Sequence, residues 1–195
     1  MENKPAVFLS ASVPLPDRHP KYFTSADVIA IRESVLALAQ VIAENGVLVF
    51  GGHPAITPLI RLAIRNSDAV VKDRFVLFQS AFFKAQYPEE NDEFERIVET
   101  IAVPEDREGS LKIMRDQMLS SYAFDAGVFI GGMEGVEEEF DLFRQTHPQA
   151  SLLPIASTGA AAKMVFDRGD FSRDLEGDFV YRALFKRHLT TKESS

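Results

Sequence analysis

The sequence contains no cysteine, and this absence excludes several classes of protein at once. Without a thiol the chain forms no disulfide, no thiolate zinc site, no iron–sulfur cluster and no cysteine nucleophile. The histidines show no HxH or HExxH spacing; they are His19, His53, His147 and His188. The sequence therefore predicts neither a structural metal nor a resident cofactor.

Long apolar runs and an excess of basic charge are missing as well. No apolar run reaches the ~20 residues of a membrane helix, and the N-terminal segment lacks the ~7–15 apolar residues of a signal peptide. Lysine and arginine total 21 against 29 aspartates and glutamates, so the formal net charge is 21 − 29 = −8. A nonspecific nucleic-acid binder needs a basic face to displace counterions. We expect a cytoplasmic protein that contacts neither a membrane nor nucleic acid.

The 195 residues, of which 46% are apolar, suffice for one ordinary domain. Short apolar runs alternate with helical patterns along the chain. Strands are predicted at 5–9, 47–50, 74–78, 96–103, 126–130 and 152–155. Helices are predicted at 27–45, 55–65, 109–121, 136–145 and 179–189, with a short one opened by 157–159. Gly46 is interpreted as the left-handed glycine that ends the first helix. Residues 81–95 are poorly patterned.

This alternation predicts an α/β fold. The strands are apolar throughout rather than at every second residue, as in a parallel sheet that is covered on both faces. We expect a Rossmann-like, doubly wound, mainly parallel sheet with helices on both faces. A single domain would span residues 1–189, and 190–195 would form a disordered tail.

Four loops that follow predicted strands share small or hydroxyl-bearing residues. They are Ser10-Ala11-Ser12, Gly51-Gly52-His53, Gly131-Gly132-Met133-Glu134-Gly135 and Ser157-Thr158-Gly159. Small residues let the backbone approach a ligand, and the helix that follows presents free N–H groups to an anion. A Gly-Gly pair after one buried strand is equally well explained as a tight turn. Together the four loops favour a phosphate or ribose site at the carboxyl ends of the strands.

Standard nucleotide motifs are absent from these loops. The first strand is not followed by GxGxxG, which argues against a Rossmann dinucleotide site. The chain also lacks the GxxxxGK[ST] motif of P-loop enzymes, the GxSxG elbow and the kinase motifs.

Four segments resemble, in the right order, the motifs of a known family. They are Phe8-Leu9-Ser10-Ala11-Ser12, Phe50-Gly51-Gly52-His53-Pro54-Ala55-Ile56-Thr57, Met114-Arg115-Asp116-Gln117-Met118 and Gly131-Gly132-Met133-Glu134-Gly135-Val136-Glu137-Glu138-Glu139. The last resembles the PGGxGTxxE signature of LOG-type phosphoribohydrolases, members of the SLOG superfamily of Rossmann-like proteins. The others are similar to a CGSS-like turn, to YGGGxxGLM and to the helix whose arginine faces the ligand. The resemblance covers residues 6 to about 165.

The chain departs from this signature at several positions. Ile130 stands in place of proline, Val136 in place of threonine, and Asp116 in place of lysine, while Glu134 is an extra residue. The resemblance thus implies a nucleotide pocket with an altered catalytic signature. Many SLOG relatives are inferred to be nucleotide sensors in bacterial stress and phage-conflict systems.

Two side chains are the candidates for catalysis or charge recognition. Glu138 lies on the face of the predicted helix near the loop, where a carboxylate binds ribose hydroxyls or stabilises an oxocarbenium-like charge. First-turn acids also simply complement a helix dipole, which is our interpretation of Glu134, Glu137 and Glu139. Arg115 has a guanidinium fork suited to phosphate, although a solvated helix arginine is the common alternative.

The leading hypothesis is a nucleotide-binding sensor for a ribose-phosphate ligand such as ADP-ribose, an NAD derivative or another nucleotide. The alternatives are a nucleoside 5′-monophosphate phosphoribohydrolase and a nucleoside deoxyribosyltransferase. We expect any effector to be a separate chain. A homodimer is expected too, since the arginine helix and its neighbour carry more apolar residues than one buried face needs. These are Ile113, Met114, Met118, Leu119, Tyr122 and Phe124.

Overall fold

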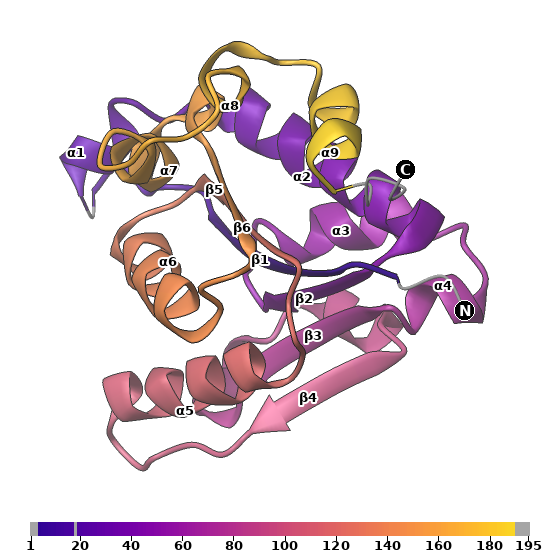
Figure 1. The fold of residues 1–195 in the computed structure, drawn as a ribbon. Helices are drawn as coiled ribbons and strands as arrows, with labels where there is room; N and C mark the ends of the chain where they lie inside the picture. Colours follow the sequence, from indigo (N-terminus) through magenta and orange to yellow (C-terminus); the bar gives the residue numbers. More distant parts are fainter. Residues whose placement is uncertain (1–3, 18, 190–195) are drawn as a thin grey trace.

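The computed structural model describes residues 4–17 and 19–189 and contains one six-stranded sheet. The predicted tail lies outside the described residues. The strands are β1 (Ala6–Ser12), β2 (Val47–Gly51), β3 (Phe75–Ser80), β4 (Arg96–Thr100), β5 (Ala126–Gly131) and β6 (Ser151–Ile155). Their order in the sheet is β4-β3-β2-β1-β5-β6, and every neighbouring pair is parallel (Figure 1). The strand order reverses between β1 and β5, which makes their carboxyl ends the switch point of the sheet.

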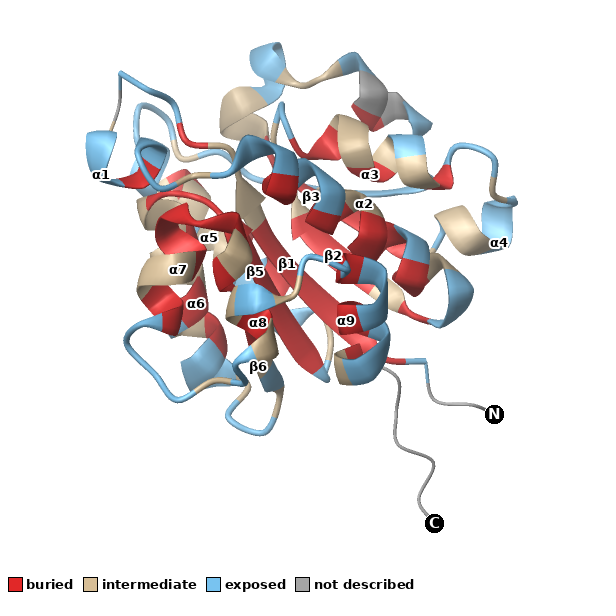
Figure 2. Cartoon of the chain, turned by 90° about the horizontal axis from the view of Figure 1, so that it is seen from above, coloured by how far each residue is buried: buried red, intermediate tan, exposed pale blue. Residues whose placement is uncertain are grey.

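Helices cover both faces of the sheet. On one face lie α2 (Val28–Asn45), α3 (Thr57–Ile64) and α9 (Tyr181–Leu189), and on the other α5 (Arg107–Ser120) and α6 (Glu134–Thr146) (Figure 1). The central strands are buried from both sides, as Figure 2 shows. The predicted doubly wound α/β fold is confirmed, because continuous apolar strands are stable only where both faces are covered.

Short helices complete the chain. They are α1 (Pro20–Phe23), α4 (Ala69–Lys72), α7 (Ala160–Phe166), α8 (Asp174–Gly177), and the 3-10 helices η1 (Ala81–Gln86), η2 (Glu89–Glu93) and η3 (Ala156–Thr158). The poorly patterned stretch 81–95 is thus occupied mainly by two 3-10 helices. All six predicted strands exist.

Several predicted helix starts differ from the observed ones by two residues, and a capping side chain explains one of them. Asp106 caps α5 by accepting a hydrogen bond from the Gly109 N–H, so this helix begins at Arg107 rather than at 109. Helix α6 begins at Glu134, two residues before the predicted start. Glu134, the extra residue of the motif, is therefore the first residue of that helix.

Gly46 corrects a sequence-based interpretation. Its φ of −176° and ψ of 178° are extended, so it is not the left-handed glycine that was expected after α2. The helix end packs closely instead: a Cβ on Gly46 would lie 3.1 Å from the Ile42 Cδ1 atom and 3.3 Å from the Pro5 carbonyl oxygen. Glycine fits this position because a Cβ would crowd Ile42 and Pro5, and not because the backbone is left-handed.

Most apolar residues of α5 face the sheet. Met114, Met118, Leu119 and Phe124 are buried in the cluster that α5 and α6 form with the strands. These four belong to the six apolar residues on which the expectation of a dimer rests, and they are buried within one chain. The other two, Ile113 and Tyr122, are only partly buried, so the dimer stays a prediction.

Among residues 4–17 and 19–189, no helix is long and apolar enough to cross a membrane.

Candidate functional site

A cleft of about 210 Å³ lies at the carboxyl ends of β1 and β2, between the starts of α5 and α6. It occupies the switch point of the sheet, where ligands of doubly wound folds bind. Its lining is Leu9, Ser10, Ala11, Ser12, Gly51, Gly52, His53, Arg107, Leu111, Met114, Arg115, Met133, Glu134, Gly135, Val136 and Glu139. The fold thus brings most of the sequence-predicted site residues together.

Gly131 and Gly132 form the turn beneath this lining. Both have positive φ, at +56° and +88°, a region that favours glycine. The Gly131 N–H donates to the Thr158 Oγ1 atom at 2.8 Å, and the Gly132 N–H donates to the Ser12 carbonyl at 2.8 Å. These two amides hold the loops together and are not free to bind a ligand.

The fourth predicted loop, Ser157-Thr158-Gly159, contacts the Gly131 turn and not the cleft itself. Thr158 is fully buried, and its hydroxyl donates to the Ile155 carbonyl while accepting from Gly131. Gly159 packs against Ser25, where an added Cβ would lie 1.8 Å from the Ser25 carbonyl oxygen. Neither Thr158 nor Gly159 belongs to the lining of the cleft.

Helix α6 points its N-terminus into the cleft. Met133 is its N-cap in an extended conformation and provides no side-chain cap. Within the part of the chain that the structure describes, the N–H groups of Glu134 and Gly135 have no acceptor. Unpaired amides at the positive end of a 13-residue helix form a favourable environment for an anion.

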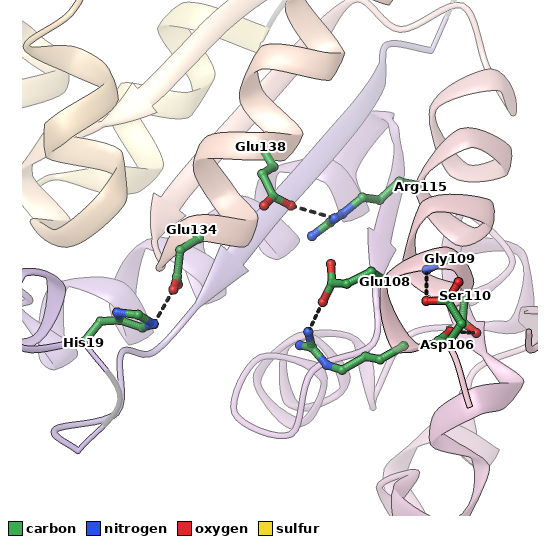
Figure 3. A network of polar contacts seen from close by, with 9 residues as sticks. His19, Asp106, Glu108, Gly109, Ser110, Arg115, Glu134 and Glu138 are labelled. Carbon is green, nitrogen blue, oxygen red and sulfur yellow. Dashed lines mark hydrogen bonds and ion pairs between the residues drawn. The ribbon is translucent and has the colours of Figure 1, made fainter. Parts of the chain in front are cut away.

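Two of the acidic residues at the start of α6, Glu134 and Glu137, pair with residues outside that helix. Glu134 forms a close ion pair with His19, as Figure 3 shows. Glu137 accepts a hydrogen bond from the Tyr22 hydroxyl at 2.6 Å and lies 3.4 Å from Arg168. These two glutamates therefore fasten the segment around α1 to α6, in addition to complementing the dipole.

Arg115 connects the other two glutamates. Its Nη1 donates to Glu138 Oε2 at 2.8 Å (Figure 3), and its Nε donates to Glu139 Oε1 at 3.2 Å. The Ser10 hydroxyl donates to the second oxygen of Glu139 at 2.6 Å. The remaining nitrogen, Nη2, lies beside Gly135, 3.3 Å from where a Cβ would be. Arg115 thus fixes Glu139 while keeping Nη2 at the start of α6.

The inner carboxylate of the cleft is Glu139, not Glu138. The Glu139 side chain is 16% exposed and lines the cleft, whereas that of Glu138 is 54% exposed. Glu138 lines an outer hollow that shares Arg107 and Arg115 with the cleft. From the acidic run alone, Glu139 is interpreted as complementing the helix dipole only. The motif did contain the signal, since counting GTxxE from Gly135 ends at Glu139.

His53 stays neutral at the edge of the cleft. Its Nδ1 accepts a hydrogen bond from the Ala55 N–H at 3.1 Å, which leaves the ring proton on Nε2. Burial lowers the pKa of His53 from 6.5 to about 4. The ring is therefore a hydrogen-bond donor rather than a cation at neutral pH.

We expect His53→Asn to reduce the loss of stability on acidification. Between pH 6.5 and 4 the unfolded chain binds a proton that folded His53 does not, so the free energy of unfolding falls by up to about 3 kcal/mol. Asparagine keeps an acceptor for the Ala55 N–H but does not titrate. Urea unfolding at pH 7 and pH 4.5 measures the difference; equal pH dependence in both proteins would contradict the assignment.

Within the described ranges, no group of three or more histidine, aspartate or glutamate side chains could hold a metal ion.

Comparison with known proteins gives one match. The model of the SLOG cluster3 family matches residues 21–189, which includes the start of α6, Arg115 and the Gly51–His53 loop. No curated protein and no solved structure matches the chain.

Proposed function

Because the chain belongs to the SLOG cluster3 family, we propose that its cleft binds a nucleotide: ADP-ribose, an NAD derivative or another ribose-phosphate compound. The observation that carries the proposal is the meeting of three groups at the switch point. Unpaired amides of Glu134 and Gly135, the Nη2 atom of Arg115 and the carboxylate of Glu139 all border one cleft. A ribose phosphate needs hydrogen-bond donors for its phosphate and hydrogen-bond acceptors for its hydroxyl groups.

The phosphate is assigned to the start of α6. There the helix dipole adds to the unpaired amides, and Nη2 of Arg115 lies next to Gly135. The guanidinium is already paired with two carboxylates, so it contributes the directed N–H groups of Nη2 rather than a free charge.

The ribose is assigned to Glu139. Arg115 and Ser10 hold this carboxylate by one hydrogen bond to each oxygen, and each oxygen retains a lone pair for a sugar hydroxyl. The same carboxylate supports a second candidate function, hydrolysis of the N-glycosidic bond, since it would face positive charge developing on the sugar.

Thermal unfolding with added nucleotide tests the binding proposal. We expect NAD, ADP-ribose or AMP, at a concentration of about one hundred times its Kd, to raise the melting temperature by about 5–10 °C. The reason is that a ligand that binds only the folded state stabilises that state. If no nucleotide raises the melting temperature at millimolar concentration, the proposal fails.

A base-release assay separates binding from hydrolysis. We expect no free base from AMP, because Val136 and Asp116 replace the threonine and lysine of the resembled signature. Steady base release that disappears in Glu139→Gln would instead favour the phosphoribohydrolase.

A homodimer also remains a proposal, and so does a separate effector chain. An interface would need side chains other than Met114, Met118, Leu119 and Phe124, which are buried within one chain. Light scattering at micromolar concentration measures the assembly directly, whereas charged substitutions at these positions would disturb the core.

A further inference from the structure

A second cavity, of about 290 Å³, adjoins the cleft at the ends of β2 and β3. Gly52, His53, Leu111 and Met114 line both spaces, so the cavity continues the cleft away from α6. Its other lining residues include Gln79, Ser80, Phe83, Gln86 and Tyr87. None of these residues is an acid, a lysine or an arginine.

Gln79 is the unusual member of this lining. The residue is 5% exposed, and its Nε2 atom is buried without any hydrogen-bond partner. Its Oε1 atom is not among the fully buried atoms without a partner, and it makes no hydrogen bond to any residue that the structure describes. The amide packs on Gly52, where an added Cβ would lie 1.9 Å from Nε2. Folded proteins rarely leave a buried amide without a hydrogen bond, so the unpaired Gln79 amide indicates that a bound ligand provides its partner.

Aromatic rings from η1 and the turn after it line the same cavity as this amide. Phe83 and Tyr87 both line the cavity, and the Tyr87 hydroxyl donates to Glu99 at 3.4 Å. Burial raises the pKa of Tyr87 to about 12, so the phenol remains neutral at physiological pH. The cavity is therefore a neutral space with aromatic and apolar walls and one unsatisfied amide.

We infer that this cavity receives the base of the nucleotide, with Gln79 reading a base edge that carries a donor beside an acceptor. A side-chain amide presents one acceptor and one donor in a plane, which is the complement of an amino group next to a ring nitrogen, as in adenine. Aromatic side chains provide stacking surfaces for such a ring. The inference rests on the proposed function and divides the ligand between a charged cleft and a neutral cavity.

The test compares ligands with and without a base. Isothermal titration calorimetry measures Kd for ribose 5-phosphate, AMP, GMP, CMP and UMP with the full chain. We expect AMP to bind about tenfold or more tightly than ribose 5-phosphate. Gln79→Met, which keeps the length but removes the amide, should remove most of that gain and leave ribose 5-phosphate binding unchanged.

Two further variants keep the test decisive. Gln40→Met makes the same chemical change on an exposed position of α2 and should alter neither Kd. Phe83→Ala removes a side chain that lines the cavity but lies in η1, outside the sheet. This variant should reduce the advantage of AMP over ribose 5-phosphate, so it tests the inference even if Gln79→Met fails to fold.

The failures of the two proposals are distinguishable. If ribose 5-phosphate and the mononucleotides bind equally, or if Gln79→Met weakens all of them alike, the base cavity is wrong while nucleotide binding stands. If neither ribose 5-phosphate nor any nucleotide binds the unmodified chain, the proposed function itself is overturned.

Discussion

Replacing Glu139 by glutamine is expected to weaken nucleotide binding by about tenfold or more. The ionised carboxylate accepts charge-assisted hydrogen bonds, and an amide both lacks the charge and presents an N–H₂ group where acceptors are needed. The hydrogen bonds that the Ser10 hydroxyl and the Arg115 Nε atom donate to the carboxylate would also weaken, because the amide is neutral. Calorimetry with the tightest-binding nucleotide measures the change.

Glu138→Gln is the matched control, because it makes the same substitution one residue earlier in α6. Glu138 also pairs with Arg115, but its side chain is 54% exposed and lies in the outer hollow. Exposed ion pairs contribute little, so we expect a change of less than about threefold. If Glu138→Gln had the larger effect, the sequence-based choice of Glu138 would stand and Glu139 would be the structural member.

Gly159→Ala is expected to lower the free energy of unfolding by about 3 kcal/mol or more. Gly159 has φ +70° and ψ −156°, a conformation that is almost restricted to glycine. An added Cβ would also lie 1.8 Å from the Ser25 carbonyl oxygen, which belongs to the backbone and cannot rotate away. The melting temperature should fall by about 6–12 °C.

Gly177→Ala provides the control for this prediction. Gly177 ends α8, and an added Cβ there would meet nothing within 4 Å. We expect a change within about 0.5 kcal/mol. Urea unfolding followed by circular dichroism measures both variants; similar stabilities would show that the approach of Gly159 to Ser25 relaxes at little cost.

The sequence by itself determined the class of fold and the edge of the sheet at which the candidate cleft lies. Continuous apolar strands such as 126–130 alternate with helical patterns, and only a parallel sheet covered on both faces buries such strands. Small residues at the ends of the first, second and fifth strands then lie at one edge, because parallel strands share a direction. These are local patterns repeated along the chain, and they are legible without coordinates.

Only the tertiary structure decided which side chains reach the cleft. Glu138 and Glu139 are neighbours in one acidic run, and the rotation of α6 against Ser10 and Arg115 places one outside and the other inside. Thr158 is buried outside the cleft, and its hydroxyl accepts a hydrogen bond from the Gly131 N–H. Gln79 gave no signal at all, since an unpaired amide exists only relative to its surroundings. The spacing of the motif does end at Glu139, but burial and pairing arise from contacts between distant segments. The pattern of residue types could therefore show neither the buried position of Thr158 nor the unpaired amide of Gln79.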